Sequence, residues 1–278
     1  MKKEFSISFN GFTIANITPV QLERIKKEGY EIWPNFKVKA LLEESISLIN
    51  ANKVWELKDD QNRYLKGEGI KIAILDTGVD YRHPDLRGDC FGQPECKVVG
   101  GYDVMNKDDD PIDDQGHGTH VVFIAAGNGS LKGVAPEAKT FAYKVLNEDG
   151  SGNYDDIIEV IERALDPNGD RDISDRVDVI NLSLGGIGDQ DDPLSQAVDN
   201  AVEASVVVVV AAGNSGPDYE TIFSPGVARK AITVGAITKS KVIASFSSRG
   251  SVIWKNQALI KPDVVAPGKD ICAVQFKV

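Results

Sequence analysis

The stretch Ile74-Leu75-Asp76-Thr77-Gly78-Val79-Asp80 decides how this sequence is interpreted. The apolar residues 70–75 predict a short buried strand, so Asp76 lies where that strand ends. Asp-Thr-Gly in this position is compatible with two catalytic uses of a carboxylate. It supplies one of two carboxylates that share a proton, or it supplies the acid that orients a histidine base.

The first use needs a partner that the chain does not contain. A carboxylate dyad requires a second Asp-Thr-Gly, or a symmetric dimer of a much shorter chain, and no second copy occurs in the 278 residues. One carboxylate cannot perform dyad chemistry. The sequence therefore favours the second use.

From residue 70 onward, short Val- and Ile-rich runs alternate with predicted helices. The runs span residues 70–75, 97–104, 140–146, 177–184, 206–212 and 231–236. Such runs are typical of a parallel sheet that is covered on both faces. Ile157, Ile161 and Leu165 recur every four residues and predict a helix with one apolar face. We therefore expect a three-layer α/β domain, with its functional residues where the strands end.

His117 is the candidate for a base that Asp76 would orient. It lies between Gly116 and Gly118 in "GHGTHV", at the start of a predicted helix. A general base near neutral pH is most often histidine. His117 and His120 form an alternative metal pair, but they are three residues apart and no third soft ligand is near. We interpret His120 as a packed helix residue, and His83 as a loop residue.

Five ordered motifs across residues 70–268 resemble the subtilisin-like serine proteases (subtilases). They are "ILDTGVDYRHPDL", "GHGTHV", "VINLSLGG", "VVAAGNSGP", and "ASFSSRG" with "KPDVVAPG". The resemblance implies Asp76 as the acid, His117 as the base and Asn214 as the oxyanion donor. It also implies that an extended peptide substrate pairs with the strand formed by Ser183, Leu184, Gly185 and Gly186.

The nucleophile that the resemblance implies is missing from the sequence. In the family it stands in a Gly-Thr-Ser segment after "KPDVVAPG", and no Gly-Thr-Ser occurs here. Ser183 lies in the substrate-binding strand, and Ser247 and Ser248 lie in a segment with a structural role in the family. We therefore do not expect any of them to replace the nucleophile. The chain is expected to end before the serine and to be inactive as written. The alternative is a relative that binds peptides, or acts like an inhibitor, without cleaving them. Phe123, where the family has a small residue, is expected to crowd the histidine helix.

The first 45 residues predict a small α+β unit of strand, helix and strand. Phe5, Ile7 and Phe9 alternate, Thr18 with Gln21 predicts a helix start, and Gly29 a helix end. The unit resembles part of the inhibitory propeptide of subtilases, which would be a partner of the catalytic domain. We therefore expect a propeptide fragment over 1–45, a linker and mature N-terminal segment over 46–69, and an incomplete catalytic domain over 70–278.

The charge balance indicates which partners to expect. Formal net charge is −11 and the isoelectric point is near 4.8. Nucleic acids and anionic membranes bind clustered Lys and Arg, so neither is expected. The longest apolar run is also too short to cross a bilayer.

The cysteines bear on the compartment in which the protein works. Cys90 and Cys96 are close enough to pair, which would favour an oxidising compartment, whereas Cys272 is isolated. The resemblance implies an extracellular or cell-surface protein, although no secretory signal is visible in the sequence.

One acidic loop is a candidate calcium site. Oxygen-bearing side chains recur through "LDPNGDRDISDRVD", and together they could ligate calcium or form a solvated loop. The candidate ligands are Asp166, Asn168, Asp170, Asp172 and Asp175. The loop departs from the EF-hand pattern, because Arg171 and Val177 stand at two of its required positions. Residues 106–114 form a weaker candidate. Asp85 matches a calcium ligand of some family members, but the loop that supplies their other ligands is shorter here.

Overall fold

The structure, a computed structural model, describes residues 3–5, 11–13, 17–30, 42–88 and 90–273. The chain divides into two compact units, Met1–Lys39 and Ala40–Val278. Each unit is considered by itself below.

The first unit contains a two-stranded antiparallel sheet and one helix. Strands β1 (Lys3–Phe5) and β2 (Gly11–Thr13) pair, and helix α1 (Pro19–Lys27) follows. Thr18 and Gln21 form the predicted capping box, and Gly29 follows the helix end with φ of +87°. The predicted alternation continues past β1 at Ile7 and Phe9, outside the described residues. The second extended piece, expected over residues 31–39, also lies outside them.

The second unit is built on a seven-stranded sheet in the order β11-β8-β7-β6-β3-β5-β4, and every neighbouring pair is parallel. The strands are β3 (Lys71–Asp76), β4 (Val98–Asp103), β5 (Lys139–Lys144), β6 (Val179–Leu182), β7 (Val207–Ala211), β8 (Ile232–Ile237) and β11 (Val264–Pro267). The six predicted strands are confirmed. β11 joins them at the edge, beside β8.

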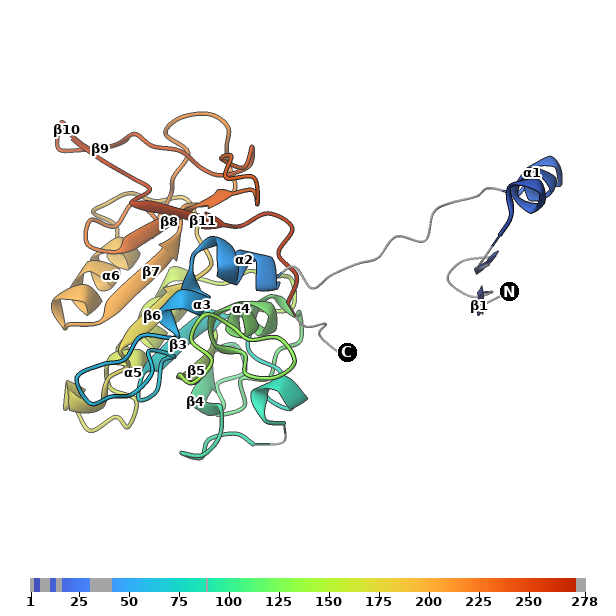
Figure 1. Cartoon of the computed structure of the whole chain (residues 1–278). Helices are drawn as coiled ribbons and strands as arrows, with labels where there is room; N and C mark the ends of the chain where they lie inside the picture. The colour runs from blue at the N-terminus through green and yellow to red at the C-terminus, as the bar shows by residue number, and fades with distance from the viewer. Residues whose placement is uncertain (1–2, 6–10, 14–16, 31–41, 89, 274–278) are drawn as a thin grey trace. The chain divides into compact units, whose positions relative to one another are not determined.

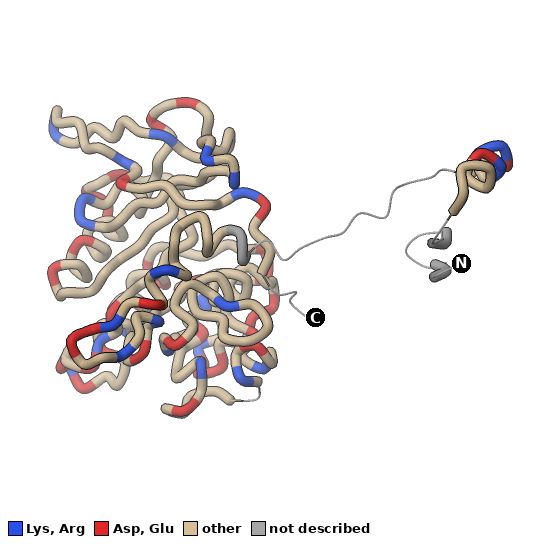
Figure 2. Tube along the Cα trace, in the orientation of Figure 1, with Lys and Arg blue, Asp and Glu red and all other residues tan. Residues whose placement is uncertain are grey.

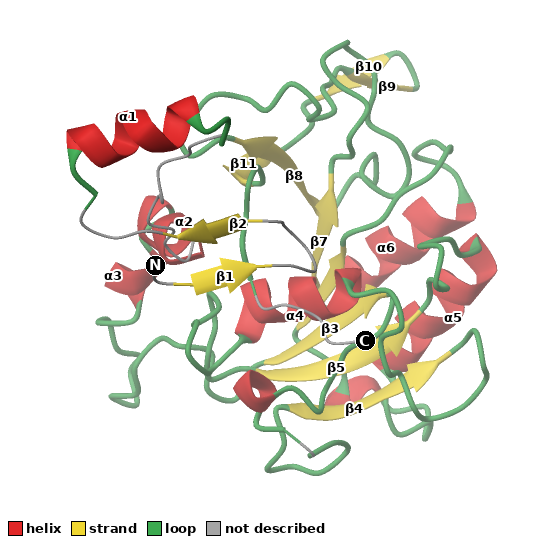
Figure 3. Ribbon diagram, turned by 90° about the vertical axis from the view of Figure 1, so that its right-hand side faces the viewer, coloured by secondary structure: helices red, strands yellow, loops and turns green. Residues whose placement is uncertain are grey.

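Helices cover both faces of this sheet, as Figures 1 and 3 show. The helices are α2 (Leu42–Leu48), α3 (Ala51–Val54), α4 (His117–Ala126), α5 (Tyr154–Leu165) and α6 (Pro193–Glu203). The predicted helix with Ile157, Ile161 and Leu165 is α5. Two short 3-10 turns (Pro84–Leu86 and Ile173–Asp175) and a hairpin of β9 (Val252–Trp254) and β10 (Gln257–Leu259) complete the unit.

Alternate residues of β3 enter two separate cores. Ala73 and Leu75 belong to the cluster formed with α5 and α6, whereas Ile72 and Ile74 belong to the cluster formed with α4. A strand that is buried on both faces has no polar alternation, which explains its continuous apolar sequence. The three-layer α/β architecture is therefore the predicted one.

Phe123 does not crowd the histidine helix as we expected. Its side chain is buried in the core under α4, and its ring meets the edge of the His83 ring at 4.8 Å between centroids. A Cβ at Gly127 would lie 2.9 Å from the Phe123 ring, so the absence of a side chain there leaves the space that the ring needs. The larger residue fills the core instead of straining it.

The segment after Lys39 belongs to the second unit. Ile46 and Ala51, from α2 and α3, are buried in a small cluster with Trp55, Ile124 and Ile271. Helix α2 starts at Leu42, before the expected linker over 46–69, and within that linker α3 packs with α2 against Ile124 of α4.

Cysteines and charges mark the surface of the second unit. Cys90 and Cys96 form a disulfide, and Cys272 is a free, exposed thiol. Figure 2 shows both signs of charge interspersed along the loops and helices. Among the described residues, no helix has the length and apolar composition needed to cross a membrane.

Candidate active site

Asp76 and His117 meet at the carboxyl edge of the sheet. Asp76 is the last residue of β3 and has no exposed surface, and His117 is the first residue of α4. Nδ1 of the His117 imidazole lies 2.7 Å from Oδ1 of Asp76. The backbone N–H of Thr77 donates to the same oxygen at 2.8 Å. The structure thus brings together the two residues that the sequence predicted as acid and base.

This contact fixes the state of the imidazole. A carboxylate can only accept hydrogen bonds, so Nδ1 carries a proton, and in the neutral imidazole Nε2 then keeps its lone pair. The hydrogen bond that His117 donates to Asp76 is the main cause that raises the pKa of His117, and the negative charges of Asp76 and Asp113 add to it, while burial opposes them. The His117 side chain is half exposed, so Nε2 can receive a proton from a bound molecule.

Two glycines allow the acid and the base to approach each other. A Cβ on Gly118 would lie 2.1 Å from the carbonyl oxygen of Gly78 and 3.1 Å from Cβ of Asp76. Gly78 has φ of +106°, and a Cβ there would lie 2.6 Å from the carbonyl oxygen of Pro111. Side chains at either position would separate α4 from the end of β3.

A buried ammonium group supports the turn that follows Asp76. Lys144, at the end of β5, pairs with Asp76 in the sheet register and is 2% exposed. Its Nζ donates to the carbonyl oxygens of Thr77 and Leu146 at 2.9 and 3.2 Å, and to Asp114 at 2.6 Å. One side chain therefore joins the loop after the acid to the loop before the base.

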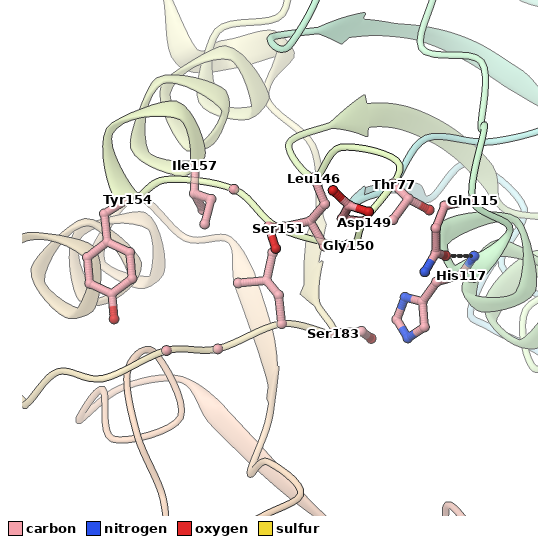
Figure 4. Close-up of a pocket in the computed structure, with 14 residues that line it drawn as sticks. Thr77, Gln115, His117, Leu146, Asp149, Gly150, Ser151, Tyr154, Ile157 and Ser183 are labelled. Atoms are coloured by element: carbon pink, nitrogen blue, oxygen red, sulfur yellow. Dashed lines mark hydrogen bonds between the residues drawn. The ribbon is translucent and has the colours of Figure 1, made fainter.

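His117 opens into a groove of about 480 Å³. Figure 4 shows His117 and Gln115 at one end of this groove and Tyr154 and Ile157 at the other. The groove is lined by Thr77, Gln115, His117, Leu146, Asp149, Gly150, Ser151, Gly152, Tyr154, Ile157, Ser183, Leu184, Gly185 and Gly186. All four residues predicted to bind a peptide strand thus lie in the same groove as the predicted base.

The strand-like segment of the groove has free backbone groups. Gly186 donates from its N–H to the carbonyl oxygen of Ser224 at 2.8 Å. The backbone groups of Leu184 and Gly185 make no hydrogen bond with another described segment. An extended chain that lies along them would find unpaired donors and acceptors.

Asn214 lies in a neighbouring cavity that also contains Ser183. This cavity, of about 350 Å³, is lined by β6, β7, β8 and β11, together with Ile124 of α4. Asn214 follows β7 and is exposed. Its loop is held by Ser248, whose hydroxyl accepts from Ser215 N at 3.0 Å and whose N–H donates to Gly213 O.

The serines considered as substitutes for the nucleophile have structural partners. Ser247 and Ser248 are almost fully buried, and the Ser247 hydroxyl accepts from Ala236 N at 2.9 Å. The Ser183 hydroxyl accepts from the Asn181 side chain at 2.9 Å. The hydroxyl groups of Ser247 and Ser248 thus accept hydrogen bonds from backbone N–H groups, in agreement with a structural role for this motif.

A profile of the subtilase family matches residues 67–277 of this sequence. The chain belongs to the subtilase family. The match includes both residues of the acid–base pair and all segments that line the groove.

Among curated subtilases, serine protease AprX of Bacillus subtilis is 39% identical over 281 residues, which cover 94% of this chain and 60% of that protein. Minor extracellular protease Vpr of the same organism is 38% identical, covering 85% of this chain and 30% of Vpr. The major intracellular serine protease of B. subtilis is 37% identical, with 83% and 66% covered. The chain therefore spans between 30% and 66% of the length of these relatives. A crystal structure of a cold-adapted subtilisin-like serine proteinase shares the fold, with a TM-score of 0.63, 28% identity, and 85% and 75% of the two chains covered.

Subtilases commonly bind calcium, but the predicted acidic loop does not fit the ion. Within the described ranges, no group of three or more His, Cys, Asp or Glu side chains is arranged to hold a metal. The carboxylate of Asp166 accepts from the N–H groups of Gly169, Asp170 and Arg171. Asn168, Asp170 and Asp172 likewise each accept from the backbone two residues onward. The first four candidate ligands thus bond within their own turns, whereas the buried Oδ1 of Asp175 has no hydrogen-bond partner among the described residues.

The two weaker calcium candidates have other partners as well. The Asp85 carboxylate accepts from the Ser130 hydroxyl at 2.8 Å. In the 106–114 loop, Asp108 accepts from Asp110 N at 3.0 Å, and Asp110 accepts from the Tyr81 hydroxyl at 2.7 Å.

The sequence analysis missed part of the groove and one buried carboxylate. The wall formed by Leu146, residues 149–152 and Tyr154 was not predicted, although it follows β5, whose carboxyl end shares an edge with that of β3. The sequence indicates Asp113 only as part of a weak calcium loop, yet it is 4% exposed and accepts from Thr77 and Gly116, the neighbours of the acid and the base.

Proposed function

We propose that this chain carries the acid, the base and the peptide-binding strand of a serine endopeptidase that cleaves extended peptides. The observation that carries the proposal is the 2.7 Å contact between Asp76 Oδ1 and His117 Nδ1, with the acid fully buried and the base open to the groove. Membership of the subtilase family supports the same chemistry.

In the proposed reaction, each residue has one role. Asp76 holds His117 with its proton on Nδ1 and stabilises the imidazolium that forms. His117 Nε2 takes the proton of a serine hydroxyl as its oxygen attacks the scissile carbonyl, and then returns that proton to the leaving amine. The Asn214 amide donates a hydrogen bond to the oxyanion of the tetrahedral intermediate.

We propose that the nucleophile comes from a segment other than those described, packed in the cavity beside Asn214. Gly-Thr-Ser is absent from the sequence, and the three alternative serines have structural partners. The cavity extends from Ser183 to Ala266 and Pro267 of β11, so a segment packed in it would lie beside both Asn214 and the proposed substrate strand.

The substrate would bind as an extra strand. Its backbone would pair with Leu184 and Gly185, and alternate side chains would enter the groove between Ser183 and Tyr154. Figure 4 shows Ser183 between His117 and Tyr154, so a strand bound along Ser183 would run from the base toward Tyr154.

The first unit is proposed to be part of the enzyme's own propeptide. The match to AprX covers 94% of the chain, so it includes residues of this unit as well as the catalytic domain. An extracellular location is supported by the Cys90–Cys96 disulfide and by one relative named as extracellular, whereas another relative is named as intracellular. Calcium has no assigned step, because no group of three or more metal-binding side chains gathers at 166–175 among the described residues.

A cleavage assay on two polypeptides tests the function. One is the 278-residue chain, and the other is the product of the gene read on past codon 278. We expect the longer product to hydrolyse an extended chromogenic peptide, to lose activity with a serine-directed phosphonate, and to lose about 10⁴-fold in turnover with Asp76→Asn. Asp178→Asn is the matched control, because this carboxylate caps Lys71 N at the opposite end of β3. The 278-residue chain should bind the peptide without cleaving it.

The alternative function is peptide binding without cleavage, which the absence of Gly-Thr-Ser favours. It predicts binding by both polypeptides and hydrolysis by neither. Hydrolysis that survives both the phosphonate and Asp76→Asn would contradict the proposed mechanism.

A further inference from the structure

Asp113 is a buried carboxylate that the proposed reaction does not use. It stands four residues before His117, in the loop between β4 and α4, and is 4% exposed. A carboxylate at such depth needs several donors to offset its loss of hydration.

Asp113 receives five hydrogen bonds, all from the two segments that carry the acid and the base. Oδ1 accepts from the Thr77 hydroxyl at 2.9 Å and from the N–H groups of Gln115 and Gly116 at 3.0 and 2.8 Å. Oδ2 accepts from the N–H and the hydroxyl of Thr119 at 2.9 and 2.6 Å. Thr77 directly follows Asp76, and Thr119 lies in the first turn of α4.

Each of the two threonine hydroxyls that donate to Asp113 also accepts a backbone N–H from the other segment. The Thr77 hydroxyl accepts from Gly118 N at 2.9 Å, so the turn after the acid is tied to the helix of the base. The Thr119 hydroxyl accepts from Asp80 N at 2.8 Å, so the helix of the base is tied to the turn after the acid. Two hydrogen bonds therefore join the turn after Asp76 to the first turn of α4. The hydroxyl groups that form them both donate to the Asp113 carboxylate.

We propose that Asp113 is a positioning residue, which sets the distance and the hydrogen bond between Asp76 and His117 through Thr77 and Thr119. This inference rests on the proposed function, because it assigns Asp113 to the same acid–base pair. Asp113 acts through the two threonines and does not touch the substrate.

A helix cap alone would not explain this arrangement. α4 begins after Gly116, which has no side chain to cap it, and Asp113 supplies the missing acceptor for Thr119 N. A cap needs only that one contact. The link from Asp113 to Thr77 is additional, and it leads to the acid. The charge of Asp113 also favours the imidazolium form of His117.

The test measures His117 directly and needs no serine. The chain has three histidines, so NMR of a histidine-labelled sample can resolve the titration of each and the low-field Nδ1–H signal of His117. We expect Asp113→Asn to shift the His117 titration to lower pH and to move or broaden the Nδ1–H signal. Asp199→Asn is the matched control. Asp199 is also 4% exposed and accepts from Arg229 and Lys230, but it lies in α6. It should change stability and leave His117 unaffected.

A second pair of variants covers the case in which Asp113→Asn does not fold. Thr119→Val removes one link and keeps the charge, whereas Thr119→Ser keeps both. We expect Thr119→Val to move the Nδ1–H signal and Thr119→Ser to restore it. If a folded Asp113→Asn or Thr119→Val protein keeps both His117 signals unchanged, the positioning role is overturned. If the His117 titration is the same in the unsubstituted chain and in Asp76→Asn, the proposed function fails instead.

Discussion

At the scale of single residues, the site depends on how closely two backbone segments approach. Asp76 is buried and its second oxygen, Oδ2, has no hydrogen-bond partner among the described residues. The carboxylate is therefore stabilised mainly through Oδ1, which Thr77 N and His117 share. A small displacement of α4 would leave a buried charge with a single donor, which is costly.

Gly118→Ala should displace the base. The added methyl would lie 2.1 Å from Gly78 O, so α4 has to move. We expect a loss of about 1–3 kcal/mol in the free energy of unfolding and a changed His117 NMR signal. Urea unfolding and a histidine spectrum measure the two effects.

Gly169→Ala is the control for this substitution. Gly169 has φ of +75° and no atom within 4 Å of a Cβ, so the variant carries backbone strain far from the site. It should reduce stability and leave the His117 signal in place. An unchanged His117 signal in Gly118→Ala as well would show that the close contact does not position the histidine.

At the scale of elements, the carboxyl ends of β3 and β5 are joined by Lys144. Replacing Lys144 by Met keeps an unbranched side chain that is one atom shorter, and it removes three hydrogen bonds, including those to Thr77 O and Leu146 O. Two carbonyl groups then lose their donor. We expect the free energy of unfolding to fall by about 2–4 kcal/mol in urea titrations.

Lys139→Met provides the comparison at the other end of β5. The Lys139 ammonium donates to the carbonyl oxygens of Glu95 and Cys96, but the residue is partly exposed, so water can replace it. Its effect should be the smaller of the two. Equal losses would argue against a special role for Lys144.

The elements also show what the sequence could predict. Strands buried on both faces have continuous Val and Ile, and for that reason six of the seven strands and α5 were found from pattern alone. The strand β11 was missed because Val264, Val265 and Pro267 in "KPDVVAPG" form too short an apolar run. The first turn of α1 was predicted because its capping box is local, whereas α6 was not singled out, although Leu194, Val198 and Ala201 form an apolar stripe on it.

The candidate site was predictable only in part. Asp76 and His117 lie in recognisable motifs, but the role of Asp113 depends on contacts across 36 residues of sequence, to Thr77. The calcium prediction did not include the backbone hydrogen bonds that Asp166, Asn168 and Asp170 accept within their own loop. Spacing alone does not reveal where a short polar side chain turns.

At the scale of the whole molecule, stability should depend on pH through a buried lysine outside the site. Burial lowers the pKa of Lys97 to about 7, although its ammonium donates to Pro136 O and Ala138 O. In the unfolded chain the pKa of a lysine is about 10.4. Between these values the unfolded state binds more protons than the folded state, so the contribution of Lys97 to stability increases as the pH rises.

Lys97→Met should flatten this dependence. Urea unfolding at pH 7, 8.5 and 9.5 would give the free energy of unfolding for both proteins. As the pH rises, the free energy of unfolding of the unsubstituted protein should increase relative to that of Lys97→Met. A constant difference across this range would show that Lys97 stays charged when the protein folds.

The same linkage has the opposite sign at His117. Because the folded-state pKa is raised, the contact with Asp76 stabilises the fold below the unfolded pKa, and this contribution is lost as the pH rises through the folded pKa. The acid–base pair is thus most stable when His117 is protonated, which is its state after it accepts a proton in the proposed reaction.

The most direct measurement of the central claim is the pKa of His117 in the unsubstituted chain and in Asp76→Asn, from NMR titration of histidine-labelled protein. His83 and His120 serve as internal controls. The account predicts a His117 pKa above the ordinary histidine value of 6.5, and a lower one in Asp76→Asn, with the two controls unchanged. The same His117 pKa in both proteins would contradict the assignment of Asp76 and His117 as a catalytic acid–base pair.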